Sequence, residues 1–199
     1  MDTKKQYPKR KRVRLKEYDY SSSGAYYLTI CTANRRCTLS RIPDDVFYHS
    51  HEECKSDNGF NPAVSVTTAR RGLAPAVADS VELTTFGEIA RAQLFKLKER
   101  FPDIFLDAFV IMPNHIHAII ILADKAAGAS PRPTVCDVVC AYKSLTTLEC
   151  RSCGLIGKLF QPSFYEHIIR SAEEYKKIKK YILENPMRWF CDELFSIEQ

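Results

Sequence analysis

The spacing of apolar residues along the 199-residue chain predicts alternating strands and helices. Residues 25–32 are rich in aromatic and β-branched side chains and follow a Ser-rich turn, a pattern typical of a strand. Residues 104–112 are nearly all apolar, as in a strand buried on both faces, and residues 115–122 return as the next strand after a Pro-Asn turn. A fourth, short strand is expected at residues 163–170.

Three further segments have apolar residues at helical intervals, and each begins with a pair of residues at capping-box spacing. The pairs are Thr85 and Glu88, Thr134 and Asp137, and Ser171 and Glu174. We expect the first helix to end before Pro102 and the third to end at Asn185, because Pro186 disfavours its continuation. Residues 151–162 are expected to form a loop.

The resulting order is strand, helix, strand, strand, helix, strand, helix. This order predicts an α+β protein of the ferredoxin-like split βαβ class, with an antiparallel sheet and one extra C-terminal helix. Residues 41–82 lack periodicity and contain several Pro and Gly residues, so we expect a surface excursion there, with a short strand near residues 63–67. The chain would thus consist of a tail, residues 1–17, and one domain, residues 18–199.

The positive charge of the chain is concentrated in its first 16 residues. The whole chain carries a formal charge of +5, but residues 1–16 hold eight basic side chains and one acidic one, so this tail is +7 and the remainder is −2. Such a tail adheres to polyanions, either nucleic acid or anionic lipid. Its candidate DNA contacts are Arg10, Arg12 and Arg14.

The chain shows no export or membrane signal in its sequence. Its longest strongly apolar run, residues 118–123, is far shorter than the ~20 residues that span a bilayer. We therefore expect a soluble, cytoplasmic protein whose eight cysteines are reduced thiols. Four of these cysteines have spacings that superficially suggest a zinc site, and we favour free thiols because the first two lie on the second helix. The four are Cys136, Cys140, Cys150 and Cys153.

His115 and His117 form the first candidate site. Residues two apart in a strand point to the same face, so both imidazoles would project together beside a turn and could bind one divalent metal ion. The alternative is a pair of partly exposed histidines that bond only to their neighbours. His49 and His51 have the same spacing, but they lie in the aperiodic excursion, where we expect no metal site.

Tyr181 and Asn185 form the second candidate site, because residues four apart share one face of a helix. A phenol is a poor nucleophile at its ordinary pKa of ~10, but a metal ion that polarises an electrophilic phosphorus compensates. The alternative is that Tyr181 packs at the edge of the apolar stripe formed by Tyr175, Ile178 and Ile182.

Together with their flanking residues, these two sites carry a family resemblance. Residues 110–118 (VIMPNHIHA) resemble the His-hydrophobic-His motif of the single-tyrosine HUH transposases, and residues 181–186 (YILENP) resemble the tyrosine helix of their REP-associated branch. Further matches are DYSSSGAYYLTI at residues 19–30, YKS at residues 142–144 and FYEHIIR at residues 164–170. The resemblance covers the chain from about residue 19 to residue 189, except the excursion.

The resemblance implies a transposase that cleaves and rejoins single-stranded or hairpin DNA, including repeats that flank its gene. By this likeness His115, His117 and Asn185 would bind Mg²⁺ or Mn²⁺, and Tyr181 would attack the scissile phosphate to leave a 5′-phosphotyrosine. Many insertion-sequence members have Gln where this chain has Asn185, and a Trp-Gln pair common in the family is Phe-Gln here, at residues 160–161. Family members differ in whether a homodimer shares the active site.

Several basic residues near the tyrosine could guide a phosphate backbone into the site, although a solvated helix face explains each of them equally well. They are Lys143, Arg170, Lys176, Lys177 and Lys180. Two other functions remain open: a non-catalytic module that binds single-stranded nucleic acid, and a metal-dependent phosphoesterase that uses water as its nucleophile.

Overall fold

The computed structural model describes residues 19–20, 22–43, 76–77, 81–123 and 133–195. Several features considered above lie outside these residues: the basic tail with Arg10, Arg12 and Arg14, the pair His49 and His51, and the strand expected near residues 63–67.

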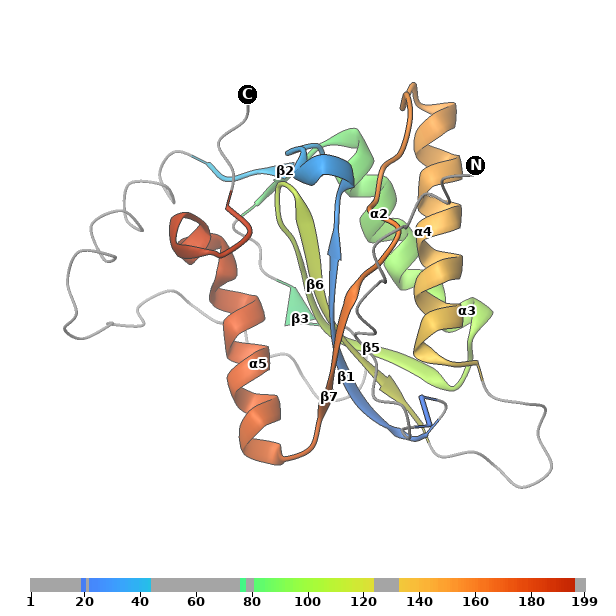
Figure 1. The fold of residues 1–199 in the computed structure, drawn as a ribbon, viewed down its shortest axis with the longest axis vertical. Coiled ribbons are helices and arrows are strands. Elements are labelled where there is room, and N and C mark those ends of the chain that lie inside the picture. The colour runs from blue at the N-terminus through green and yellow to red at the C-terminus, as the bar shows by residue number, and fades with distance from the viewer. Residues whose placement is uncertain (1–18, 21, 44–75, 78–80, 124–132, 196–199) are drawn as a thin grey trace, which may run out of the picture.

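Four antiparallel strands form the centre of the molecule (Figure 1). They are β1 (Gly24–Cys31), β5 (Ile104–Ile111), β6 (His115–Leu122) and β7 (Tyr165–Ile169), and they lie side by side in the order β5-β6-β1-β7. The short β3 (Ala76–Val77) pairs in parallel with β5 and extends the sheet at that edge. β2 (Ser40–Arg41) and β4 (Glu82–Leu83) form a separate two-stranded sheet.

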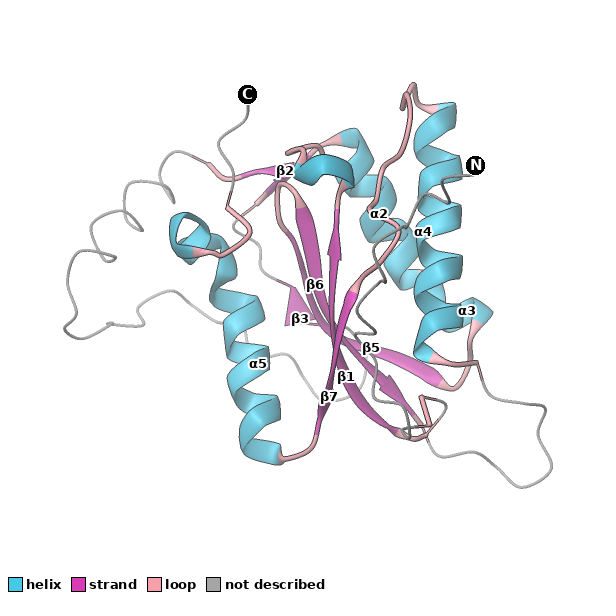
Figure 2. Ribbon diagram, in the orientation of Figure 1, coloured by secondary structure: helices cyan, strands magenta, loops and turns pink. Residues whose placement is uncertain are grey.

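The helices cover both faces of this sheet (Figure 2). α2 (Thr85–Phe95), α3 (Leu97–Arg100) and α4 (Val135–Ser152) lie on one side, and α5 (Ala172–Glu184) lies on the other. Two 3₁₀ segments complete the fold: η1 (Ala33–Arg35) follows β1, and η2 (Asn185–Cys191) continues from α5. The chain order and the strand order are those of a ferredoxin-like domain with an extra C-terminal helix, which confirms the predicted fold class.

Successive side chains of β1 point to opposite faces of the sheet and contribute to two separate hydrophobic cores. Tyr26 and Leu28 are buried in the larger core under α2 and α4. Tyr27 points to the opposite face and packs against the smaller core, which contains Ile182 of α5 and Trp189 of η2. The predicted apolar stripe of α5 therefore faces the sheet, and any polar residue on this face of β1 or β6 lies under α5.

The helix starts differ slightly from those expected. α2 is capped by Thr84, whose hydroxyl accepts a hydrogen bond from Gly87 N–H, so the expectation of a cap at Thr85 was one residue late. α4 begins with the predicted capping box of Thr134 and Asp137. It continues to Ser152, so the loop expected from residue 151 begins later.

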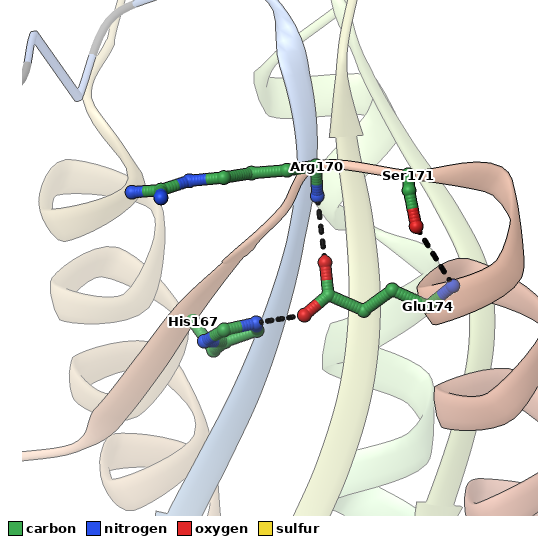
Figure 3. Close-up of polar contacts among 4 residues, drawn as sticks. All are labelled: His167, Arg170, Ser171 and Glu174. Atoms are coloured by element: carbon green, nitrogen blue, oxygen red, sulfur yellow. Dashed lines mark hydrogen bonds and ion pairs between the residues drawn. The ribbon is translucent and has the colours of Figure 1, made fainter.

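The start of α5 has half of the expected capping box (Figure 3). The Ser171 hydroxyl accepts from Glu174 N–H at 3.1 Å, as predicted. The Glu174 carboxylate, however, bonds the Arg170 N–H at 2.8 Å and His167 Nε2 at 2.6 Å rather than the Ser171 backbone. The cap therefore ties α5 directly to the end of β7, because His167 and Arg170 belong to that strand and its junction.

The cysteines of α4 do not gather into a metal site. Among the described residues, no group of metal-ligating side chains includes a cysteine, and Cys150 is buried while Cys140 and Cys153 are exposed. Six described cysteines are free thiols, but Cys191 is disulfide-bonded, so the expectation that all are reduced was wrong at that position. No helix in the described part of the chain has the length and apolar character needed to cross a membrane.

Candidate active site

Two buried histidines lie on the face of β6 that α5 covers. His115 and His117 are 0% and 3% exposed, and their ring centroids are 4.4 Å apart. The Nε2 atom of each ring is buried and has no hydrogen-bond partner, and the same is true of Oδ1 of Asn185. Each of the three residues predicted to bind a metal ion therefore has one buried lone-pair atom without a partner.

A fixed hydrogen bond orients the His115 ring. Its Nδ1 lies 2.8 Å from Oδ1 of Asn114, and the Asn114 amide nitrogen donates to the Leu194 carbonyl at 2.8 Å. Because an amide oxygen only accepts, Nδ1 of His115 must be the donor, which leaves the lone pair of a neutral ring on Nε2. This tautomer is the one that binds a metal ion through Nε2.

Two hydroxyl groups orient the His117 ring. Its Nδ1 lies 2.7 Å from the Tyr27 hydroxyl and 2.9 Å from Oγ1 of Thr29, both on β1. The Tyr27 ring also stacks on His117, with 5.3 Å between centroids. Because a hydroxyl accepts as well as donates, these contacts are compatible with a proton on Nδ1 and a lone pair on Nε2, and they hold the ring in place from β1.

Burial keeps both imidazoles neutral. Loss of solvation lowers the pKa of His115 to about 4, although the Asp192 carboxylate partly opposes the shift. Burial, followed by the neighbouring His115, lowers the pKa of His117 well below its usual value. At neutral pH both rings therefore offer a lone pair, as a metal ligand must.

Tyr181 lies beside the histidines on α5. Its ring centroid is 5.4 Å from that of His117, and its side chain is 40% exposed. The hydroxyl donates to Oδ2 of Asp192 at 3.0 Å, and the Asn185 amide donates to the same oxygen at 2.8 Å. Burial, together with the Asp192 charge, raises the pKa of Tyr181 above its ordinary value, so the phenol is protonated until it reacts.

Asp192 is the site residue that sequence reasoning missed. Its carboxylate lies with the two imidazoles in a group whose potential ligand atoms are all within 4.8 Å of one another. It follows η2 in a stretch with no periodic pattern, and its second oxygen accepts from Leu194 N–H at 2.7 Å. An acidic residue shortly after the tyrosine helix was the one available signal, and many surface acids share it.

The site opens into a cleft of about 600 Å³. It is lined by residues of β1 and β6, by Tyr181 of α5, by residues 192–194 and by residues 161 and 163–165. His117 and Tyr181 line this cleft, whereas the buried His115 and Asn185 do not.

Lys143 supports the wall of the cleft. Its ammonium group donates to the carbonyl oxygens of Gln161, Pro162 and Ser163, and burial lowers its pKa. Its predicted contact with DNA stays a prediction, since these three carbonyls are its partners in the structure.

The remaining basic candidates lie around α5. Lys176, Lys177 and Lys180 are exposed on the helix, and Arg170 is exposed just before it. Lys180 pairs with Glu184 at 3.6 Å. Their contact with DNA also remains a prediction.

Comparisons with known proteins give two relatives by sequence. The chain is 27% identical over 201 residues to an uncharacterized protein of Haemophilus influenzae, covering 94% of this chain and 93% of that protein. It is 29% identical over 106 residues to the REP-associated tyrosine transposase of Escherichia coli, covering 53% of this chain and 58% of that protein. No family model matches the chain.

One solved structure is described as a REP-associated tyrosine transposase bound to a REP hairpin. It has 21% sequence identity and a TM-score of 0.47 over 83% of this chain and 67% of that chain. The sequence relative confirms the resemblance. By sequence, the chain is therefore similar to a REP-associated tyrosine transposase, as its histidine and tyrosine motifs predict.

Proposed function

We propose that this chain is a metal-dependent tyrosine DNA transposase that cleaves and rejoins single-stranded or hairpin DNA. The observation that carries the proposal is the position of the Tyr181 hydroxyl, which opens on a cleft beside three buried lone-pair atoms that lack partners. Unpaired buried atoms cost stability, so three of them gathered at one site favour a ligand over a purely packing role for His115, His117 and Asn185. The sequence relative in Escherichia coli supports the same reaction class.

The residues that would hold the metal ion are His115 and His117 through Nε2 and Asn185 through Oδ1, with the Asp192 carboxylate as a further oxygen ligand. Two imidazoles with carbonyl and carboxylate oxygens suit Mn²⁺, and Mg²⁺ accepts the oxygen ligands of such a set. The ion, when bound, supplies Lewis-acid polarisation of the scissile phosphate.

The chain's own residues would carry the nucleophile and its proton. As the Tyr181 oxygen forms its bond to phosphorus, Oδ2 of Asp192, its hydrogen-bond acceptor, takes the phenolic proton. The bond from phosphorus to the 3′-oxygen breaks, and that oxygen takes a proton from water to become a 3′-hydroxyl. The other product is a 5′-phosphotyrosine, from which a 3′-hydroxyl can displace Tyr181 to rejoin a strand.

The basic residues would hold the DNA on either side of this step. Lys176, Lys177 and Lys180 lie on the tyrosine helix and Arg170 lies just before it, and the tail would add Arg10, Arg12 and Arg14. We place the reaction in one domain, residues 18–199, of a cytoplasmic protein that acts on repeats flanking its gene. A homodimer is compatible with this mechanism but is not required by it.

The experiment that tests the proposal is a search for the covalent adduct. End-labelled hairpins and single strands taken from the sequences flanking the gene are incubated with Mn²⁺, and protein-bound label is separated under denaturing conditions. We expect an adduct with the native protein and none with Tyr181→Phe. Tyr175→Phe is the matched control because Tyr175 lies on the same helix, and its adduct should equal that of the native protein.

The outcomes distinguish the other two functions. An adduct that survives Tyr181→Phe would show that another residue is the nucleophile. Strand cleavage without any adduct would indicate a phosphoesterase that uses water. Binding with neither cleavage nor adduct would indicate a non-catalytic nucleic-acid-binding module.

A further inference from the structure

Tyr165 is an exposed aromatic residue that the mechanism above does not use. It begins β7, lines the same cleft as Tyr181, and is 51% exposed. In the described part of the sheet, β7 is an edge strand that pairs only with β1. A flat ligand can therefore approach the Tyr165 ring from solvent.

The ring of Tyr165 is held in place by its neighbours on β1. Thr29 lies directly opposite it across the strands, and Tyr27 lies diagonally, with its ring at 6.4 Å and an angle of 72° between the planes. Edge-to-face contact fixes the ring without covering its exposed side. The orientation of Tyr165 is thus set before any ligand binds.

A continuous series of rings connects Tyr165 with the reactive tyrosine. The series runs from Tyr165 through Tyr27 and His117 to Tyr181, with steps of 6.4, 5.3 and 5.4 Å between centroids. Because both tyrosines line the same cleft, a DNA strand whose phosphate lies at Tyr181 can carry another of its nucleotides past Tyr165. The cleft volume of about 600 Å³ is within the range of pockets that enclose a small organic ligand.

We propose that Tyr165 is a stacking platform for an unpaired nucleobase of the strand whose scissile phosphate lies at Tyr181. The inference rests on the proposed function, since it assumes that DNA enters this cleft. Every base has an aromatic face, so stacking here would select unpaired over paired DNA without reading its sequence. Stacking on Tyr165 would therefore give the protein a preference for single-stranded DNA in this cleft.

The test compares DNA with and without bases. One probe is a short oligodeoxythymidine, and the other is a strand of equal length in which every residue is abasic, so that both carry the same phosphates. Binding of the full chain to each probe is measured by fluorescence anisotropy with Tyr165→Ala, Tyr165→Phe and the native protein. The matched control is Phe105→Ala, which removes an exposed aromatic ring of β5 that does not line the cleft.

We expect Tyr165→Ala to weaken binding of oligodeoxythymidine by about 5- to 30-fold and to leave binding of the abasic strand unchanged. Tyr165→Phe should retain the native affinity because it keeps the ring, and Phe105→Ala should have no effect on either probe. A strand containing 5-iododeoxyuridine should also crosslink to Tyr165 on irradiation, as mapped by mass spectrometry. The crosslink detects the base even if the tail contributes most of the affinity.

An equal loss of affinity for both probes would overturn the inference, because it would indicate a general loss of structure or of phosphate contacts. Native-like binding by Tyr165→Ala, with no crosslink at Tyr165, would also overturn it. The proposed function is tested separately by the Tyr181 adduct. If Tyr165→Ala weakens binding of oligodeoxythymidine alone but the native protein forms no adduct, the platform is retained and the transposase reaction is rejected. If the native protein forms the adduct but Tyr165→Ala binds both probes as the native protein does, the transposase reaction is retained and the platform is rejected.

Discussion

Addition of a divalent metal ion should stabilise the folded protein, because the proposed ligand atoms come together only when the chain is folded. Three buried atoms of the proposed site have no hydrogen-bond partner: Nε2 of His115, Nε2 of His117 and Oδ1 of Asn185. Each buried acceptor left without a partner costs about 1–3 kcal/mol, so the set costs roughly 3–9 kcal/mol of folding free energy. An ion that engages all three recovers part of this cost in the folded state alone.

The expected shift follows from linkage between binding and folding. Metal at about 100 times its dissociation constant adds about 2.7 kcal/mol to the free energy of unfolding. For a domain of this size each kcal/mol raises Tm by roughly 2–4 °C, so Tm should rise by about 5–11 °C. The added free energy of unfolding is smaller than the cost of the three unpaired atoms, so their binding to the ion is sufficient to account for it.

The assay is thermal unfolding followed by circular dichroism, with the protein first treated with a chelator and then titrated with Mn²⁺ or Mg²⁺. His117→Ala removes one of the three atoms and should abolish most of the shift. Tyr181→Phe keeps all three and should retain it. A Tm that does not respond to either ion, or a shift in His117→Ala equal to that of the native protein, would refute the metal site.

Three further predictions concern the elements that build the site. Ser171→Ala removes the cap of α5 and should lower the unfolding free energy by about 1 kcal/mol, measured by urea denaturation, whereas Ser171→Asn should retain it. The pKa of His115 is about 4 in the folded protein and about 6.5 when unfolded, so the unfolded chain binds the extra proton between these values. The free energy of unfolding should therefore be independent of this histidine's protonation above about pH 6.5. It should fall as the pH is lowered toward 4, by up to about 1.4 kcal/mol per pH unit for each such histidine. A chelated protein whose Tm is constant over that range would contradict the assignment. Lys143→Met removes the donor to three carbonyls of residues 161–163 and should speed amide hydrogen exchange in that segment; unchanged exchange with weaker DNA binding would instead indicate a direct phosphate contact.

The fold could be predicted because its signals are local. Residues 115–122 are rich in β-branched isoleucine, as is typical of a buried strand. The capping box of Thr134 and Asp137 places the start of α4 correctly. The one-residue error at Thr84 arose because two threonines stand side by side and both are chemically suited to cap a helix. Only the observed bond from Gly87 N–H distinguishes them.

The site could be predicted only in part because its other members are brought together by tertiary contact. His115 and His117 share a face by strand geometry alone, and Tyr181 and Asn185 share a helix face by their spacing. Asp192 joins them through the path of η2, which no periodic pattern describes. The support given to His117 by Tyr27 likewise depends on the pairing of β1 with β6, a contact between residues 90 apart in sequence.

The composition of β6 distinguishes a binding role for the histidines from a packing role. Positions 115, 117, 119 and 121 face α5, and the last two are isoleucines that pack with the smaller core. Apolar residues at the first two positions would continue that core and remove two unpaired nitrogen atoms. The chain instead has imidazoles there, each oriented through Nδ1 so that Nε2 points to no acceptor or donor of the described protein. The alternative of partly exposed histidines satisfied by their neighbours is therefore inconsistent with their burial and with these unpaired atoms. The two unpaired Nε2 atoms cost folding free energy, and they lie beside the Asp192 carboxylate, which accepts a hydrogen bond from the Tyr181 hydroxyl. A ligand that binds both nitrogen atoms and this carboxylate at once, as proposed above, would explain why the chain has histidines at these positions.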